Sequence, residues 1–245
     1  MKVFGHRGFS GEYPENTMLA YKKAVEAGCD GIELDVQLTR DLVPVLIHDE
    51  SVDRTSNGSG YIHNMTYDEL TRLDFSYTAK FGDKHGFQKI PTLEEYFEWV
   101  VAEAPEITTN VELKNSVYYY AGLEKVVLDM IYKYKLKDRI ILSSFNNTSV
   151  ARCKEMDPDI ACGFLIEGCI ENAGAYARDF CVEYYHPRLK DMTEEHVLNC
   201  SQNGIGVNVW TVNEEEDLRR MKKWGVRSVI TNFPDVARKI ADERI

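Results

Sequence analysis

Short apolar runs alternate with amphipathic segments along most of this chain. The runs have the length of β-strands, and the segments between them repeat apolar residues with the 3.6-residue period of a helix. This alternation is typical of repeated βα units around a parallel sheet. Strands are predicted at residues 3–4, 31–38, 109–113, 140–144, 161–166, 183–185, 207–211 and 229–231. Eight such strands fit a closed α/β TIM (β/α)8 barrel, and the second prediction leaves open a continuation through residues 43–47.

Several of the predicted helices have recognisable start and stop signals. The first helix is expected to begin near Asn16 or Thr17 and to end at Gly28. The segment 213–225 has acidic residues in its first turn and basic residues in its last turn, as the helix dipole favours. These signals support helices that connect the strands of a barrel.

One stretch departs from this alternation. Residues 50–90 are largely polar and contain one short helical patch, and they are too numerous for a simple βα loop. We therefore expect one barrel domain over residues 1–245, in which residues 50–90 form a small insertion after the second strand. The insertion is expected to cover or shape a substrate pocket, and a tolerated surface excursion is the alternative.

The composition of the chain limits the kinds of molecule that it is expected to bind. Hydrophobic residues make up 44% of the chain and charged residues 28%, which is ordinary for a folded globular protein. The formal net charge is -11, and proteins that bind nucleic acids generally need a basic face to neutralise phosphates. No nucleic-acid partner is therefore expected. A small anionic substrate would need a local cation, from a metal ion or from a well-placed Arg or Lys.

The spacing of the cysteines argues against a zinc site, and the hydropathy of the chain argues against insertion into a membrane. The six cysteines show neither a CxxC pair nor the Cys/His spacing of a zinc site, so structural thiols are expected. No window of 18 apolar residues occurs, so no stable membrane insertion is expected. The first strand follows Met1 and Lys2 directly, which leaves no room for a signal peptide and favours a cytoplasmic protein.

Polar side chains gather where the predicted strands end. In a TIM barrel the active site lies at the carboxyl ends of the strands and in the loops that follow them. Glu33 and Asp35 are two residues apart on one predicted strand, so both project to the same side. The residues expected at the barrel mouth are His6, Arg7, Gly8, Glu33, Asp35, His48, Asp49, Glu112 and Lys114.

The acidic residues of this group suggest a metal ion. Carboxylates inside an apolar strand are costly to bury unless a cation compensates their charge. With Glu112 from the neighbouring strand, Glu33 and Asp35 would supply three carboxylates, which suit one hard divalent metal ion, Mg2+ or Ca2+. The alternative is a buried carboxylate network that pairs with Arg7 and Lys114.

His6 and His48 follow different predicted segments and would stand beside the carboxylates. Since histidine titrates near neutral pH, one of them could take a proton while the other gives one. Arg7 beside Gly8 would suit a phosphate, because glycine permits a close approach of the backbone; an ordinary barrel salt bridge is the alternative. The other histidines are expected to be packing or surface residues: His63, His85, His186 and His196.

The order of short motifs along the chain resembles that of the glycerophosphodiester phosphodiesterase family. The motifs are HRG, PENT, ELDVQLTRD, PVLIHD, DRTSNGSG, IPTLEE, VELK, SSFN, WTVN and TNFPD, and together they span essentially the whole sequence. HRG followed by PENT, ELDV and HD is highly specific. The resemblance implies a TIM barrel with a small insertion after the second strand, a single divalent metal ion and two catalytic histidines.

The resemblance also implies roles for individual residues. His6 and His48 would be the acid/base pair, and Glu33, Asp35 and Glu112 would hold the metal ion.

Four more residues would contact the substrate. By the same resemblance, Arg7 and Lys114 would face the phosphate, while Phe145 and Trp210 match aromatic positions near the pocket. Packing at the top of the barrel is an equal interpretation of the two aromatic residues. The PENT segment would support the site at the end of the first strand, with helix capping as the alternative role of Asn16.

These roles imply hydrolysis of a small-molecule glycerophosphodiester to glycerol 3-phosphate and an alcohol. The alternative is a phospholipase-type phosphodiesterase that acts on lipid or inositol phosphodiesters, for which an apolar rim and an export signal are expected. A catalytically silent barrel would have lost one of the histidines or carboxylates, and all of them are present.

Overall fold

Eight parallel strands form a closed barrel in the computed structural model, which describes residues 1–243. The strands are β1 (Lys2–His6), β2 (Gly31–Leu38), β4 (Thr108–Leu113), β5 (Ile140–Ser144), β6 (Cys162–Ile166), β7 (Tyr184–Pro187), β8 (Gly206–Val209) and β9 (Ser228–Thr231). Each strand pairs with its neighbours in chain order, and β1 closes the ring by pairing with both β2 and β9. The predicted TIM barrel is confirmed.

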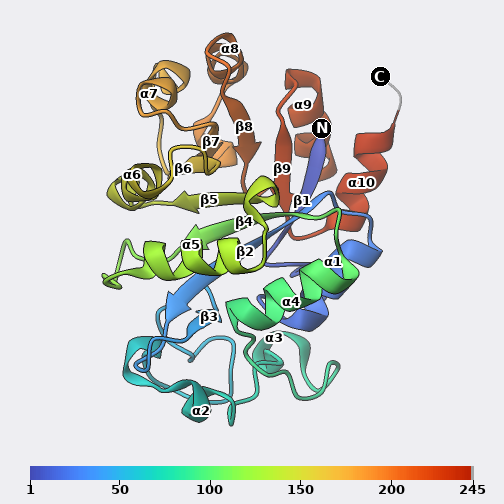
Figure 1. Cartoon of the computed structure of the whole chain (residues 1–245). Coiled ribbons are helices and arrows are strands. Elements are labelled where there is room, and N and C mark those ends of the chain that lie inside the picture. Colours follow the sequence, from blue (N-terminus) through green and yellow to red (C-terminus); the bar gives the residue numbers. More distant parts are fainter. Residues whose placement is uncertain (244–245) are drawn as a thin grey trace.

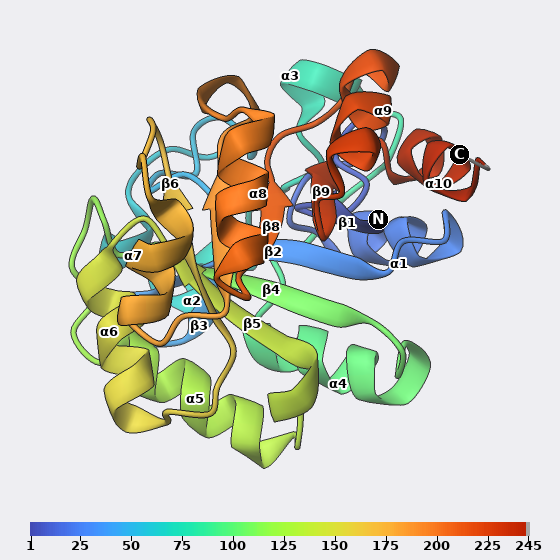
Figure 2. The ribbon, with the colours of Figure 1, turned by 90° about the horizontal axis from the view of Figure 1, so that it is seen from above.

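Helices surround the strands on the outside of the barrel (Figures 1 and 2). They are α1 (Met18–Glu26), α4 (Leu93–Glu103), α5 (Leu123–Lys133), α6 (Asn147–Met156), α7 (Ala173–Asp179), α8 (Glu194–Gln202), α9 (Glu215–Trp224) and α10 (Pro234–Asp242). Two short 3-10 turns, η2 (Lys137–Arg139) and η3 (Leu189–Asp191), lie in the connections. None of the helices formed by residues 1–243 combines the length and the hydropathy that crossing a membrane requires.

The first helix begins at one of its two predicted caps. The side-chain oxygen of Thr17 accepts a hydrogen bond from the backbone N–H of Ala20, which satisfies a free donor in the first turn of α1. Asn16 instead donates from Nδ2 to Oδ2 of Asp35 at 2.8 Å. The PENT segment therefore starts the helix and also touches the acidic residues of the barrel.

The chain reverses direction after β2, so the suggested continuation through residues 43–47 is wrong. The short strand β3 (Pro44–Leu46) pairs antiparallel with β2. The reversal uses Leu42 in the left-handed conformation, with φ 62°. The backbone N–H of Ile47 then donates to the carbonyl of Asp35 at 3.0 Å. Because of this return, His48 comes to lie beside the carboxyl-terminal half of β2.

The insertion lies between β3 and α4, to one side of the barrel (Figure 1). It contains η1 (Ile62–Asn64), α2 (Tyr67–Leu70) and α3 (Thr78–Phe81). With β3 it forms a small apolar core that is separate from the main core: Val45, Ile47, Val52, Ile62, Leu70, Phe75 and Ile90. Lys80 donates from Nζ to the backbone carbonyl of Ser10 at 2.7 Å, so the insertion also contacts the loop after β1.

Strand β2 is buried on both faces, and its two faces differ in chemistry. Ile32, Leu34, Val36 and Leu38 belong to the apolar core between the strands and the helices. The alternate residues point the other way, because successive side chains of a strand face opposite sides. Glu33, Asp35 and Gln37 are therefore directed into the barrel, where the fold delivers them to one site.

Candidate active site

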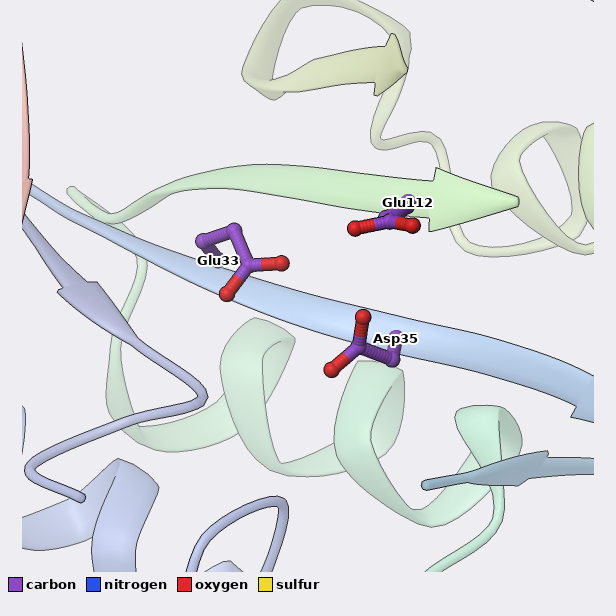
Figure 3. A group of neighbouring side chains, drawn as sticks. All are labelled: Glu33, Asp35 and Glu112. Carbon is purple, nitrogen blue, oxygen red and sulfur yellow. The ribbon is translucent and has the colours of Figure 1, made fainter. Parts of the chain in front are cut away.

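Three carboxylates meet inside the barrel. Glu33 and Asp35 project from β2 and Glu112 projects from β4, and their side chains face a common space (Figure 3). One oxygen atom of each carboxylate lies within 4.8 Å of the others. Asp35 stands directly opposite Glu112 in the register of the two strands. The structure thus brings together the three acidic residues that the sequence grouped.

Burial and mutual repulsion perturb these carboxylates. Burial, with the negative charges of Asp35 and Glu112, raises the pKa of Glu33 well above its usual range. Burial also raises the pKa of Glu112, and Asp35 adds to this effect against the opposing charge of Lys114. Burial alone would raise the pKa of Asp35 too, but the positive charges around it hold that pKa below its usual range. Three ionised carboxylates would therefore carry more negative charge than Arg7 and Lys114 balance.

The cluster fits a hard divalent cation. Such ions bind carboxylate oxygens at about 2.0–2.6 Å, so two oxygens on one ion lie at most about 5 Å apart. The separation of 4.8 Å meets this limit. Within the described part of the chain, Oδ1 of Asp35 is buried and has no hydrogen-bond partner. A cation between the three carboxylates would satisfy this oxygen and relieve the repulsion.

His6 is held by a residue from the other end of the chain. Its Nδ1 lies 2.6 Å from Oδ1 of Asn232, in the loop after β9. Because an amide oxygen only accepts hydrogen bonds, Nδ1 carries the proton and Nε2 keeps a free lone pair. Burial, assisted by the charge of Arg7, lowers the pKa of His6 to about 3. The ring is therefore neutral at neutral pH.

His48 is fixed through its ring and through the backbone around it. Its Nδ1 lies 2.7 Å from Oδ1 of Asp49. The buried amide of Gln37 donates to the carbonyls of Ile47, His48 and Asp49 at 3.1, 3.1 and 2.7 Å. The hydroxyl of Tyr120 in turn donates to Oε1 of Gln37 at 2.9 Å. These contacts hold the turn that carries His48 against β2.

Arg7 combines a strained backbone with several ionic contacts. Its φ of 54° lies in the left-handed region, and Gly8 follows with φ 84°. Its backbone N–H donates to Oε2 of Glu33 at 2.9 Å. Its Nη1 lies 2.8 Å from Oε1 of Glu15, and its Nε lies 3.3 Å from Oδ2 of Asp35. Arg7 therefore makes barrel salt bridges and also lines the pocket.

Lys114 approaches the acidic cluster from the end of β4. Its Nζ lies 2.9 Å from Oε1 of Glu112 and 4.0 Å from Oδ1 of Asp35. Burial lowers the pKa of Lys114, but the two carboxylates outweigh burial and the pKa is raised. The same Nζ lies 6.0 Å from the centre of the Phe145 ring. Lys114 is therefore a charged neighbour of the cluster rather than part of the pocket wall.

A pocket of about 300 Å³ opens over the cluster. The predicted site residues in its wall are His6, Arg7, Glu33, His48, Glu112, Phe145 and Trp210. The rings of Phe145 and Trp210 meet edge to face, with centres 5.4 Å apart. Of the residues that the structure describes, none from 50–90 lines this pocket. The insertion therefore lies outside the wall of this pocket.

Four residues of the site escaped the sequence analysis. Asn232 holds His6, Gln37 holds the His48 turn, and Arg54 binds the side chain of Asp49. Asn110 lines the pocket, and its amide has no hydrogen-bond partner within residues 1–243. Gln37 and Asn110 stand two residues from predicted metal ligands on β2 and β4, so strand alternation was the signal that could have found them.

The four other histidines lie away from the pocket wall within residues 1–243. His186 is fully buried and its Nε2 lies 2.9 Å from Nδ2 of Asn208. His63 stacks on Tyr118, and His85 packs against Phe81. His196 accepts a hydrogen bond at the start of α8. These contacts agree with packing and surface roles.

The barrel, the acidic cluster, the paired histidines and the adjacent basic residues together define a TIM-barrel phosphoric diester hydrolase. The model of the glycerophosphoryl diester phosphodiesterase family matches residues 6–236. The chain belongs to this family.

Relatives resemble the chain over nearly its whole length. A glycerophosphodiester phosphodiesterase of Caldanaerobacter subterraneus subsp. tengcongensis is 41% identical over 236 residues, which cover 95% of this chain and 94% of the relative. One of Bacillus altitudinis is 40% identical over 244 residues, covering 99% and 98%. A solved phosphodiesterase of Oleispira antarctica, in complex with the product sn-glycerol-3-phosphate, has a TM-score of 0.86 at 27% identity, covering 99% and 97%.

Proposed function

We propose that the protein hydrolyses glycerophosphodiesters to glycerol 3-phosphate and an alcohol, with one divalent metal ion and acid/base catalysis by His6 and His48. The observation that carries this proposal is the convergence of three carboxylates and two histidines in one pocket. The sn-glycerol-3-phosphate bound to the Oleispira antarctica relative supports the choice of substrate class.

Glu33, Asp35 and Glu112 would hold the metal ion, which we propose is Mg2+ or Ca2+ because all the ligands are hard oxygen atoms. When bound, such an ion supplies Lewis-acid stabilisation of a phosphate oxygen. Arg7 would direct its guanidinium at the phosphate, since it lines the pocket next to His6. Lys114 would act over a longer range by balancing the charge of Glu112.

The unlike partners of the two histidines support unlike roles. His6 is neutral and its Nε2 lone pair is free, so it would take the proton from the attacking hydroxyl group. His48 faces the carboxylate of Asp49, which orients its ring, so it would give a proton to the leaving alcohol. Phe145 and Trp210 would form an apolar wall beside the organic part of the substrate.

The test is the release of glycerol 3-phosphate from glycerophosphocholine by metal-stripped protein, with Mg2+ or Ca2+ added back. We expect activity to return with the metal, and to fall at least about 100-fold in His6→Ala and Glu33→Ala. The matched control is His196→Ala, a surface histidine at the start of α8. Turnover of lysophospholipids or inositol phospholipids without turnover of glycerophosphocholine would overturn the substrate assignment.

A further inference from the structure

Arg54, in the insertion, uses all five of its N–H groups in contacts with Asp49, Glu15 and Tyr77. Its Nε and Nη2 donate to the two oxygens of Asp49 at 2.7 and 3.0 Å. Its Nη1 and Nη2 donate to the two oxygens of Glu15 at 2.8 Å each. The remaining Nη1 proton points to the hydroxyl of Tyr77 at 3.4 Å. The guanidinium of Arg54 therefore binds two carboxylates, each through both of its oxygens.

Each of these carboxylates has a second partner in the pocket wall. Asp49 contacts Nδ1 of His48 at 2.7 Å. Glu15 contacts Nη1 of Arg7 at 2.8 Å. Arg54 thus stands between the histidine proposed as the acid and the arginine proposed to bind phosphate, although it does not line the pocket itself.

The network is ionised and partly shielded from water. The side chain of Glu15 is only 11% exposed. Burial would raise its pKa, but hydrogen bonds from Arg54 and the charge of Arg7 outweigh burial and lower the pKa to about 2. Glu15 is therefore a carboxylate at neutral pH. Bidentate hydrogen bonds between charged groups fix the relative position of their side chains more strongly than hydrogen bonds between neutral groups do.

We propose that Arg54 is a positioning residue that sets the placement of His48, through Asp49, relative to Arg7, through Glu15. This inference rests on the proposed phosphodiesterase function. It gives the insertion a part in catalysis without contact with the substrate. Lysine would not replace Arg54, because an ammonium group has three donors and lacks the planar fork that holds two carboxylates at once.

The first experiment compares Arg54→Lys with Arg40→Lys in the hydrolysis of glycerophosphocholine. Arg40, in the turn after β2, also contacts the insertion, through Glu69 and the carbonyl of Asn64, but it is largely exposed and contacts neither Glu15 nor Asp49. We expect kcat to fall roughly 10- to 100-fold in Arg54→Lys, since a small misplacement of a catalytic group has this effect. Arg40→Lys should keep kcat within about threefold of the unmodified protein.

A mutant cycle separates positioning from a loss of folded protein. Because the effect of Arg54 passes through Asp49 to His48 and through Glu15 to Arg7, adding Arg54→Lys to a variant with both Asp49→Asn and Glu15→Gln should slow that variant no more than about threefold. Independent effects would multiply instead. Thermal unfolding of each variant shows whether it is folded, and added guanidinium ion should partly restore kcat in Arg54→Ala but not in Arg40→Ala.

Three results would contradict the positioning role. These are an unchanged kcat in Arg54→Lys, losses that multiply in the cycle, and an equal response of the two alanine variants to guanidinium. An unmodified protein that fails to hydrolyse glycerophosphocholine at all would instead overturn the proposed function, so the two failures are distinguishable.

Discussion

At the scale of single residues, the two histidines of the site differ more in their partners than in their positions. Nδ1 of His6 meets a neutral amide oxygen, whereas Nδ1 of His48 meets a carboxylate. A neutral partner fixes the tautomer without favouring the charged ring. A carboxylate fixes the tautomer and also places a negative charge beside the ring. This asymmetry is the basis of the proposed roles, in which one ring accepts a proton while the other releases one.

A substrate with a better leaving group tests this division of roles. p-Nitrophenolate leaves without help from an acid, so His48→Ala should lose at least about tenfold less activity on glycerol 3-phosphate p-nitrophenyl ester than on glycerophosphocholine. His6→Ala should lose similar factors on both substrates, because the nucleophile is the same. The measurement is kcat/KM for each pair, and equal losses on both substrates in His48→Ala would reverse or remove its assignment as the acid.

The sequence shows some of these residues far better than others. Glu33, Asp35 and Glu112 are visible because charged residues at alternate positions of an apolar strand have few explanations. Asn232 and Arg54 lie in loops without periodicity, and each acts on a residue far away along the chain. Both residues stand in motifs of the family resemblance, DRTSNGSG and TNFPD, but their roles depend on how the barrel closes and how the insertion folds back.

At the scale of elements, helix α4 links the insertion to the barrel and has a well-formed start. The side chain of Thr92 accepts a hydrogen bond from the backbone N–H of Glu95, and Oε2 of Glu95 accepts one from the N–H of Thr92. This reciprocal capping box satisfies two donors that the helix itself leaves free. The helix therefore has a defined first residue, next to the insertion.

Removal of this cap should affect stability and leave the chemistry intact. Thr92→Ala is expected to lower the free energy of unfolding by about 1 kcal/mol, with kcat unchanged because α4 lies outside the pocket. Urea unfolding followed by circular dichroism measures the loss. Thr148→Ala is the matched control, since Thr148 is exposed in the first turn of α6, which Asn146 caps. Similar losses in both variants would show that the capping box contributes nothing specific.

Strands and helices differ in how far the sequence defines them. The limits of β2 follow from the regular alternation of apolar and polar residues along it. Prediction and structure agree at residues 31–38. The reversal into β3 has no comparable signal, because it places Leu42 in a left-handed conformation that usually selects glycine or asparagine. A branched apolar residue at that position looks like part of a strand, which explains the error.

At the scale of the whole molecule, the acidic cluster that would bind the metal ion also lowers the stability of the metal-free protein. Buried carboxylates that repel one another destabilise the folded protein until a cation joins them. Their cost is distributed through the barrel, because β2 and β4 are neighbouring strands of the closed sheet. The folded state should therefore respond to a divalent metal ion even without substrate.

Thermal unfolding tests this response directly. Mg2+ or Ca2+ at 100 times its dissociation constant should stabilise the metal-stripped protein by about 2.7 kcal/mol. Glu33→Gln should be more stable than the unmodified protein when both are metal-free, and should gain much less from added metal. The control is Glu155→Gln, an exposed glutamate on α6. A melting temperature that is indifferent to metal would contradict the assignment of the cluster as a metal site.

The contact between His6 and Asn232 spans 226 positions of the chain and crosses the seam where β1 meets β9. His6 ends the first strand of the barrel, yet the amide that fixes its tautomer follows the last strand. Seven strands of the barrel consequently separate the histidine from its partner along the chain. The orientation of His6 thus depends on the closing of the ring, because a barrel without β9 and the loop that follows it would lack this amide.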